Sequence, residues 1–348
     1  MIKIGNINIS KNNKPFIIAE MSGNHNHSLE RAFEIVDAAA ESGAHALKLQ
    51  TYTADTITID KEDGEFFISD PKSLWKGETL YNLYKQAYTP WEWHKPIMDR
   101  CKEKGILCFS SPFDFSAVDF LEELNMPAYK IASFENVDLS LIKKVAKTGK
   151  PIIVSTGMAT VQEIAEAVDA IRSTGNEQII LLKCTSTYPS TPENTNIITI
   201  PHLRDLFQCE VGLSDHTMGI GVSVASVALG AVVIEKHFTL NREDGGVDST
   251  FSMEPKEMKA LVIETERAWQ ALGKINYGPT EKEKASLVFR RSLYVVEDIK
   301  AGDMITEKNV RSIRPGYGLP PKFFDLVMGK RVNQDVKRGT GLSWEMFG

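Results

Sequence analysis

Two histidines lie near the ends of consecutive apolar runs that are typical of buried strands. His216 lies in the run 211–217, and His237 lies in the run 232–240, 21 residues further along the chain. If these runs form neighbouring parallel strands, their ends meet, and the two imidazoles could bind one divalent metal. Two histidine ligands with oxygen ligands in the remaining positions leave room for water and substrate, which is typical of a catalytic metal site. Hydrogen-bonded structural histidines are the alternative interpretation.

A carboxylate ends the first apolar run of the chain. Glu20 closes the run 16–20, so its side chain is expected to face the same edge of the sheet as the two histidines. From there it could hydrogen-bond a metal-bound water or act as a general base. A helix cap or a salt-bridged carboxylate is the alternative.

Two lysines also lie inside strand-like runs. Lys48 belongs to the run 46–52 and Lys130 to the run 128–133. An unpaired ammonium inside a barrel is costly, which favours a binding role over a structural one. Hydroxyl and amide side chains lie in or end the same kind of run: Gln50, Ser110, Ser111, Ser133, Ser155, Thr156, Thr185 and Ser186. Lysines and hydroxyls that converge on one mouth predict a pocket for a small polyanion.

The usual nucleotide motifs are missing from the sequence. Neither GxGxxG nor GxxxxGK followed by Ser or Thr occurs, which argues against a dinucleotide or ATP site of the common type. The net charge of -6 provides no general basic surface for nucleic acid or an anionic membrane. The four cysteines show no CxxC spacing and the N-terminus has no signal-type apolar core, so we expect a cytoplasmic protein with reduced thiols.

The elements that must position these side chains repeat along the chain. Eight short β-rich runs alternate with segments of helical period, several of which end at a glycine: 16–20, 46–52, 107–113, 128–133, 151–157, 179–186, 211–217 and 232–240. Repeated βα units predict a parallel sheet covered by helices. Eight units in about 275 residues predict an α/β fold of the (β/α)8 TIM-barrel type, with the functional site at the carboxyl ends of the strands.

Two segments depart from this repeat. An aromatic-rich insertion over 53–105, which includes Trp75 and Tyr84, is expected over the barrel mouth as a lid or dimer contact, with structural filler as the alternative.

We assign 1–276 to the barrel, 277–288 to a polar linker and 289–348 to a small β-rich domain. A domain of about 60 residues is marginal alone, so this one is expected to dock on another surface.

Short motifs at the strand ends carry a family resemblance. FIIAEMSGNHN, ALKLQT, FSSPFD, AYKIAS, IIVSTGM, KCTSTYP, GLSDHT and EKHFT occur in this order. Together they resemble the sialic acid synthase family of phosphoenolpyruvate-dependent nonulosonate synthases. The tail, with RSLYVVEDIKAGDMIT and SIRPGYGL, resembles the antifreeze-like (SAF) domain that ends those enzymes. The resemblance covers nearly the whole chain.

This resemblance implies a set of roles. The SAF domain would be swapped onto the partner's barrel in a homodimer, where Arg314 would reach the acetamido group of the sugar. His216 and His237 would bind Mn²⁺, Mg²⁺ or Co²⁺, and Glu20 would hold a metal-bound water. The expected ligands of phosphoenolpyruvate are Lys48, Ser111, Lys130, Ser133, Ser155, Ser186 and Ser214. Matches at positions near substrate or metal are Gln50, Glu135, Tyr188, Glu235 and Asp248.

Further motifs concern the identity of the sugar. KLQTYT, TPWEWH and FRRSLYVV resemble the branch that makes pseudaminic acid from 2,4-diacetamido-2,4,6-trideoxy-L-altrose, for glycosylation of flagella or surface polysaccharide. Ser186 and the sequence EMSGNH depart from the neuraminate pattern. N-acetylneuraminate or legionaminate synthesis remains an alternative. Other classes are a pyruvate aldolase with Lys48 or Lys130 as Schiff base, and an ice- or carbohydrate-binding protein.

Overall fold

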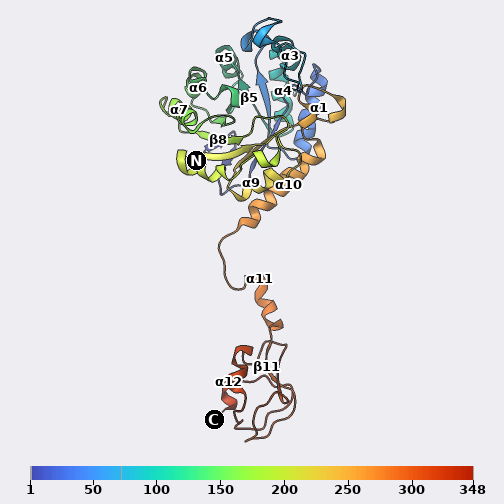
Figure 1. The fold of residues 1–348 in the computed structure, drawn as a ribbon, viewed down its shortest axis with the longest axis vertical. Helices are drawn as coiled ribbons and strands as arrows, with labels where there is room; N and C mark the ends of the chain where they lie inside the picture. The colour runs from blue at the N-terminus through green and yellow to red at the C-terminus, as the bar shows by residue number, and fades with distance from the viewer. Residues whose placement is uncertain (1, 72, 348) are drawn as a thin grey trace. The chain divides into compact units, whose positions relative to one another are not determined.

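Eight parallel strands close into a barrel within the unit Met1–Gly273 of the structure, a computed structural model that describes residues 2–71 and 73–347 (Figure 1). In chain order they are β3 (Phe16–Glu20), β4 (Ala46–Thr51), β5 (Leu107–Pro112), β6 (Tyr129–Ile131), β7 (Ile152–Ser155), β8 (Ile179–Cys184), β9 (Glu210–Ser214) and β10 (Val233–His237). β10 pairs with β3 and closes the ring. Nearly all of their residues are buried, as a parallel sheet covered by helices requires. The predicted TIM barrel is confirmed.

Helices surround the strands: α1 (Leu29–Glu41), α4 (Trp91–Glu103), α5 (Phe115–Glu123), α6 (Leu139–Ala146), α7 (Val161–Arg172), α8 (Thr199–Phe207), α9 (Gly221–Ala228) and α10 (Pro255–Leu272) (Figure 1). Local sequence defines their ends. The Thr160 side chain accepts a hydrogen bond from the backbone of Glu163 in a capping box at the start of α7. Gly43 follows α1 with a φ of 86°, a conformation that favours glycine.

The sequence analysis missed an N-terminal hairpin. β1 (Ile2–Ile4) pairs antiparallel with β2 (Ile7–Ile9) across a turn at Gly5. A Cβ at Gly5 would lie 2.7 Å from the Cδ2 atom of Leu107, the first residue of β5. The hairpin therefore packs against the amino ends of the strands, opposite the predicted site. Alternating isoleucines around a Gly-Asn pair were the signal for it.

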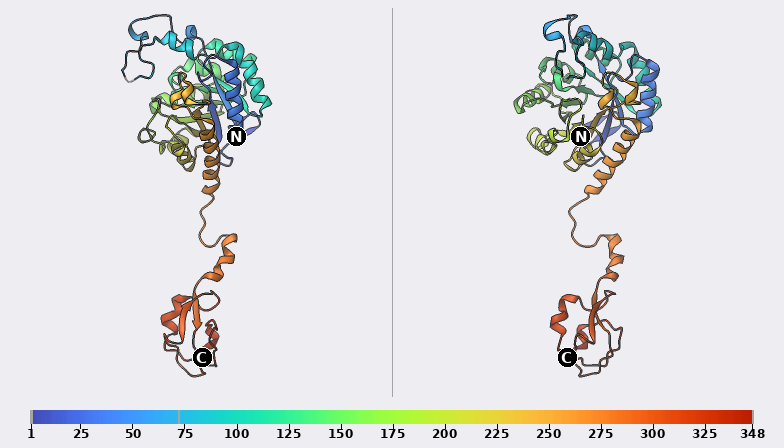
Figure 2. Two further views of the ribbon diagram at one scale, coloured as in Figure 1. Left: turned by 90° about the vertical axis from the view of Figure 1, so that its right-hand side faces the viewer. Right: turned by 45° about the vertical axis from the view of Figure 1, so that its right-hand side comes forward.

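The insertion after β4 is shorter than predicted. α4 lies within the predicted insertion 53–105 but packs beside α1 as a helix of the barrel. Its Arg100 forms an ion pair of 2.6 Å with Asp37 of α1. The aromatic residues and a proline inside α4 masked its helical period. The remaining insertion contains α2 (Ala54–Ile57), a 3-10 turn at Gly64–Phe66 and α3 (Leu80–Ala87). In Figure 2 this light-blue segment projects from one end of the barrel.

The unit Lys274–Gly348 has its own apolar core. It contains α11 (Glu281–Lys284), β11 (Ser292–Val295), β12 (Val310–Ile313) and α12 (Phe324–Val327). β11 and β12 pair antiparallel, and Leu293 and Val310 lie fully buried between the surrounding loops. Among the residues that the structure describes, no helix is both long and apolar enough to cross a membrane.

Candidate active site

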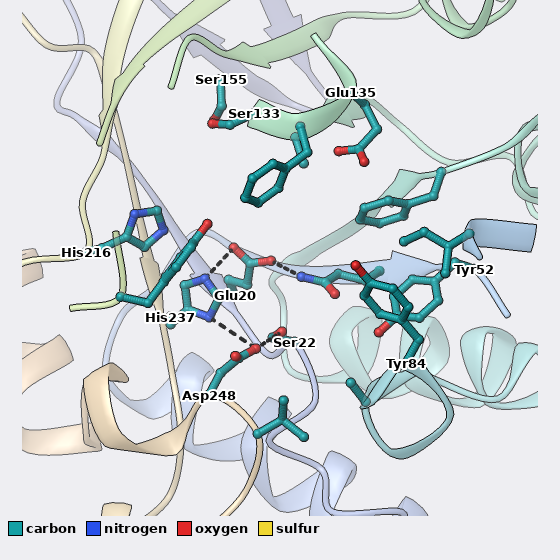
Figure 3. Close-up of a pocket in the computed structure, with 18 of the residues that line it drawn as sticks. Glu20, Ser22, Tyr52, Tyr84, Ser133, Glu135, Ser155, His216, His237 and Asp248 are labelled. Atoms are coloured by element: carbon teal, nitrogen blue, oxygen red, sulfur yellow. Dashed lines mark hydrogen bonds and ion pairs between the residues drawn. The ribbon is translucent and has the colours of Figure 1, made fainter. Parts of the chain in front are cut away.

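A cavity of about 490 Å³ lies at the carboxyl ends of the barrel strands (Figure 3). Its size is in the range of small-molecule sites. The strands contribute Glu20, Lys48, Gln50, Lys130, Ser155, Cys184, Ser214, Glu235 and His237, and the following loops contribute Ser22, Ser133, Glu135, Tyr188, His216 and Asp248. The structure thus brings most of the predicted site residues to one cavity.

The two histidines lie side by side in this cavity, with ring centroids 5.4 Å apart. The Nδ1 atom of His216 lies 3.0 Å from the Thr185 carbonyl and donates to it, which leaves its Nε2 atom free as a ligand. The Nε2 atom of His237 lies 3.4 Å from Glu20, and its Nδ1 atom faces Asp248 at 3.9 Å, beyond hydrogen-bond distance. The Nε2 atom of His216 and a ring nitrogen of His237 therefore suit a divalent cation as ligands.

The described part of the chain contains no group of three or more His, Cys, Asp or Glu side chains arranged as a metal site. A cation held by His216 and His237 would therefore take further ligands from water or substrate. Such a coordination sphere with open positions is typical of catalytic sites.

Lys48 and Lys130 are buried together with two carboxylates. The Nζ atom of Lys48 lies 2.8 Å from Glu20 Oε2 and 2.9 Å from Glu235 Oε1. Lys130 lies 3.5 Å from the same oxygen of Glu235. The assumption that these lysines are unpaired was wrong, because the neighbouring strands supply their counter-charges. The second oxygen of Glu235 still has no hydrogen-bond partner in the described residues.

Strand register explains this cluster. His237 of β10 lies opposite Glu20 of β3, and Glu20 lies opposite Lys48 of β4. One layer of the barrel therefore places an imidazole, a carboxylate and an ammonium side by side. Burial alone would raise the pKa of Glu20, but the charges of Lys48, His237 and Lys130 together outweigh it and hold this pKa below its usual range. Burial would lower the pKa of Lys48, but Glu20 and Glu235 raise it, so the ammonium keeps its charge.

Hydroxyl groups line another part of the cavity. Ser155 is buried, and its Oγ atom has no hydrogen-bond partner among the residues described. Gly157 is required here, because a Cβ at this position would lie 2.2 Å from the Oγ of Ser186 and 2.6 Å from the Oγ of Ser133. The absence of a side chain lets these hydroxyls approach one another, which suits a small anion that accepts several hydrogen bonds.

Six of the residues predicted to form the site do not line the cavity: Ser110, Ser111, Thr156, Thr185, Ser186 and Arg314. Ser111 ends β5 as a buried residue whose hydroxyl has no partner in the described chain. Ser186 lies next to Gly157 and is not among the lining residues. Arg314 belongs to the unit Lys274–Gly348, directly after β12.

Polar residues complete the cavity wall. Burial raises the pKa of Glu135 to about 7 against the opposing charge of Lys130, so this carboxyl can exchange a proton near neutral pH. Gln50 donates a hydrogen bond of 2.7 Å to Glu20, and Ser22 donates one to Asp248. Figure 3 shows Asp248 and Ser22 beside His237, with Glu135 on another side of the cavity.

Several lining residues were missed by the sequence analysis. Cys184 and Ser22 line the cavity, and neither belongs to a residue type or spacing that singled it out. From the insertion, Trp75 and Tyr84 reach the cavity, and Trp75 donates a hydrogen bond of 3.1 Å to the Val247 carbonyl. These two were not missed, because the sequence analysis named both in the aromatic-rich insertion that it expected over the barrel mouth. Trp91, by contrast, stacks on a phenylalanine of α5 in the barrel's helix layer.

A second buried ion pair lies behind the histidines. Lys236 contacts Asp215 at 3.1 Å and donates a hydrogen bond of 2.6 Å to the Thr217 carbonyl. Because side chains alternate along a strand, Lys236 points away from the cavity that its neighbour His237 lines. Asp215 directly precedes His216 in the chain, just as Lys236 directly precedes His237. The pair therefore links the two chain segments that carry the histidines.

We expect Lys236→Met to lower the free energy of unfolding by about 3–5 kcal/mol, because Asp215 would be left as an uncompensated buried charge. Urea denaturation measures this change. The double variant Asp215→Leu/Lys236→Met removes both charges and should recover most of the loss. A loss below about 1 kcal/mol in the single variant, as for a surface pair, would contradict this assignment.

The fold and the site together define a class of protein. A (β/α)8 barrel with buried lysines, hydroxyls and two histidines at the carboxyl ends of its strands has the architecture of a TIM-barrel enzyme. The chain belongs to the NeuB family, which it matches over residues 35–277, and residues 290–348 match the SAF domain.

Individual relatives agree with this family. The chain is 46% identical to a pseudaminic acid synthase of Campylobacter jejuni, over 98% of each chain. It is 43% identical to a pseudaminic acid synthase of Helicobacter pylori, over 94% of this chain and 96% of that one. A crystal structure of N-acetylneuraminic acid (sialic acid) synthetase from Leptospira borgpetersenii superposes with a TM-score of 0.72 at 34% identity, and covers 82% of this chain and 94% of that one.

Proposed function

We propose that the protein catalyses pseudaminic acid synthesis, the condensation of phosphoenolpyruvate with 2,4-diacetamido-2,4,6-trideoxy-L-altrose to a nine-carbon 2-keto acid and phosphate. One observation carries the proposal. A chain similar over nearly its full length to pseudaminic acid synthases contains one cavity that combines two histidines with buried lysines and the unpaired hydroxyl of Ser155.

Phosphoenolpyruvate would bind among the lysines and hydroxyls. Lys48 and Lys130 would offset the charge of its phosphate and carboxylate, with hydrogen bonds from serines: Ser111, Ser133, Ser155, Ser186 and Ser214. Unpartnered buried hydroxyls at Ser111 and Ser155 support this, because buried polar groups normally have a partner. Preorganised charge of this kind is commonly the largest catalytic contribution.

The histidines would hold a divalent cation, Mn²⁺, Mg²⁺ or Co²⁺. When bound, such a cation supplies Lewis-acid polarisation of the sugar's aldehyde oxygen. His216 and His237 fit this role through their free ring nitrogens. Glu20 would orient the attacking water, and Asp248, Gln50 and Tyr188 would border the sugar.

The reaction needs one new carbon–carbon bond and one broken carbon–oxygen bond. C3 of phosphoenolpyruvate attacks the aldehyde carbon, and water adds to the cationic C2. The tetrahedral intermediate then expels phosphate together with the bridging oxygen, which leaves the 2-keto acid. Glu135 could accept the proton that the water releases, because its pKa is raised to about 7 by burial and one of its oxygens has no partner among the described residues.

The small unit would complete the site in a domain-swapped homodimer. Arg314 is exposed and forms no hydrogen bond or ion pair with the described residues. Its guanidinium would bind an acetamido oxygen of the sugar in the partner's barrel. The four cysteines are unpaired, which fits a reducing cytoplasm, from which the product would feed glycosylation of flagella or surface polysaccharide.

Two alternative functions can be distinguished from the proposed one, the first by its sugar and the second by its chemistry. A legionaminate or N-acetylneuraminate synthase would share the mechanism and differ in the sugar. A pyruvate aldolase would form a Schiff base, for which burial and a lowered pKa favour Lys130 over Lys48. Borohydride would trap such an adduct with pyruvate, but the two histidines would then have no role.

We expect phosphate release when the enzyme is given phosphoenolpyruvate and the diacetamido-trideoxy-altrose. With phosphoenolpyruvate labelled at its C2 oxygen, mass spectrometry should find the label in phosphate, because the carbon–oxygen bond breaks. N-acetylmannosamine serves as the comparison sugar. A comparable kcat/KM for it would contradict the proposed sugar, and label retained in the keto acid would contradict the proposed bond cleavage.

A further inference from the structure

One side of the cavity lacks charged groups. The cavity-lining residues that the structure describes between positions 52 and 87 are all uncharged. We call six of them the apolar side: Tyr52, Ile57, Ile68, Leu80, Leu83 and Tyr84. All except Tyr52, which directly follows β4, belong to the insertion. The lysines, carboxylates and histidines lie on the barrel strands and on other loops, so the cavity has two chemically different parts.

The apolar side is a built surface. Tyr52 is 3% exposed, and its ring packs against the rings of Tyr84 and Phe113 at centroid distances of 5.8 and 5.1 Å. Ile68 is fixed by backbone hydrogen bonds of 2.9 Å to Glu78 and Gly77. In Figure 3, Tyr52 and Tyr84 lie across the cavity from His216 and His237.

The polar atoms on this side suit an amide. No hydrogen bond joins the hydroxyl of Tyr52 or Tyr84 to another described residue, so both can donate to a ligand. The side chains of Ile68 and Leu80 themselves offer only carbon atoms to a hydroxyl group of a ligand packed against them. Burying such a group without a partner is unfavourable.

The substrate must span these two parts. Its aldehyde end has to lie near the histidines and phosphoenolpyruvate, where the bond forms. An open-chain hexose would extend its C4–C6 end away from them, and the tyrosines of the apolar side lie across the cavity from the histidines. In the proposed sugar that end carries an acetamido group at C4 and a methyl group at C6, whereas common hexoses carry hydroxyls at both positions.

We infer that the apolar side binds the C4–C6 end of the sugar and selects a 6-deoxy substrate, with the C6 methyl packed on Ile68 and Leu80. The inference rests on the proposed function and extends it, because it assigns the sugar preference to the insertion. A C6 hydroxyl would be desolvated there without a partner, which disfavours a 6-hydroxy sugar.

A pair of sugars that differ by one oxygen atom tests this inference. We compare kcat/KM for 2,4-diacetamido-2,4,6-trideoxy-L-altrose with that for its 6-hydroxy analogue. The wild type should prefer the 6-deoxy sugar by on the order of 100-fold. Ile68→Asn and Leu80→Asn should each reduce this ratio by on the order of tenfold, because they offer the hydroxyl a partner.

The matched control is Ile59→Asn, because Ile59 is 57% exposed on the same insertion and does not line the cavity. It should leave the ratio unchanged. Circular dichroism and the KM for phosphoenolpyruvate should stay at wild-type values in all three variants, and Ile68→Thr replaces any variant that fails this check.

The outcomes separate this inference from the proposed function. If the wild type converts neither diacetamido sugar, the proposed function is wrong. If it converts both at similar rates, or if the Ile68 and Leu80 variants keep the wild-type ratio, the function stands and the role of the apolar side is overturned. An equal change in Ile59→Asn would also overturn it.

Discussion

His216→Ala is expected to lose at least about 1,000-fold in kcat/KM, because several kcal/mol of transition-state stabilisation depend on the cation that this imidazole would hold. Chelator treatment of the wild type should have the same effect, and Mn²⁺, Mg²⁺ or Co²⁺ should restore activity. Phosphate release measures the rate, and isothermal titration of the metal-free protein with Mn²⁺ measures binding.

The control for this prediction is His202→Ala, because His202 is exposed on α8 and does not line the cavity. It should keep wild-type turnover and Mn²⁺ affinity. The His216 variant should remain folded, since its ring contributes to the mouth of the barrel and not to the apolar core. Full activity of His216→Ala in the presence of chelator would exclude a role for this residue in metal binding.

Local sequence determined most of the barrel. Each predicted strand is a short β-rich run, and each has a buried strand at its centre, because a parallel strand must be apolar on both faces. Prediction failed where local signals compete. In α4, Pro96 and a cluster of aromatic residues hide a helix that tertiary packing on α1 stabilises. The hairpin at Gly5 is only three residues long on each side, which is too short for a periodicity to be recognised.

The position of a strand end identified the candidate site, but it could not identify the partners of each side chain. Lys48 was assigned a binding role because it was expected to be unpaired. In the structure, register across three neighbouring strands brings Glu20 and Glu235 to it, and this register is a property of barrel closure. The same closure pairs Lys236 with Asp215 on the other face of the strands.

For the insertion, composition predicted the location but not the role of each aromatic residue. Its aromatic content predicted contact with the barrel mouth, and Trp75 and Tyr84 do line the cavity. Composition alone could not distinguish Trp75 and Tyr84, which line the cavity, from Trp91, which packs in the helix layer. This distinction depends on where α4 begins. The polar groups of the cavity could therefore be predicted from the residues at strand ends. The shape of the cavity depends on the insertion, which does not follow the βα repeat.

Arg314→Ala is expected to reduce kcat/KM for the sugar by at least about 100-fold, with little change in the KM for phosphoenolpyruvate. A buried charge-assisted hydrogen bond to an acetamido oxygen would account for about 1.5–3 kcal/mol of this loss, and misplacement of the sugar for the rest. Arg311→Ala is the matched control, because Arg311 is an exposed arginine of β12 in the same unit. Steady-state kinetics with each substrate varied in turn measures both constants.

Mixing two inactive variants determines which chain supplies the arginine. If Arg314 enters the barrel of the partner, a heterodimer of Arg314→Ala and His216→Ala chains contains one site with both defects and one with neither. About a quarter of the wild-type activity should then return after subunit exchange, because random pairing makes half of the dimers mixed and each has one intact site. If the small unit serves its own barrel, every site retains one defect and no activity returns. Circular dichroism of each variant alone checks that both are folded, and recovery on mixing can then come only from a site shared between two chains.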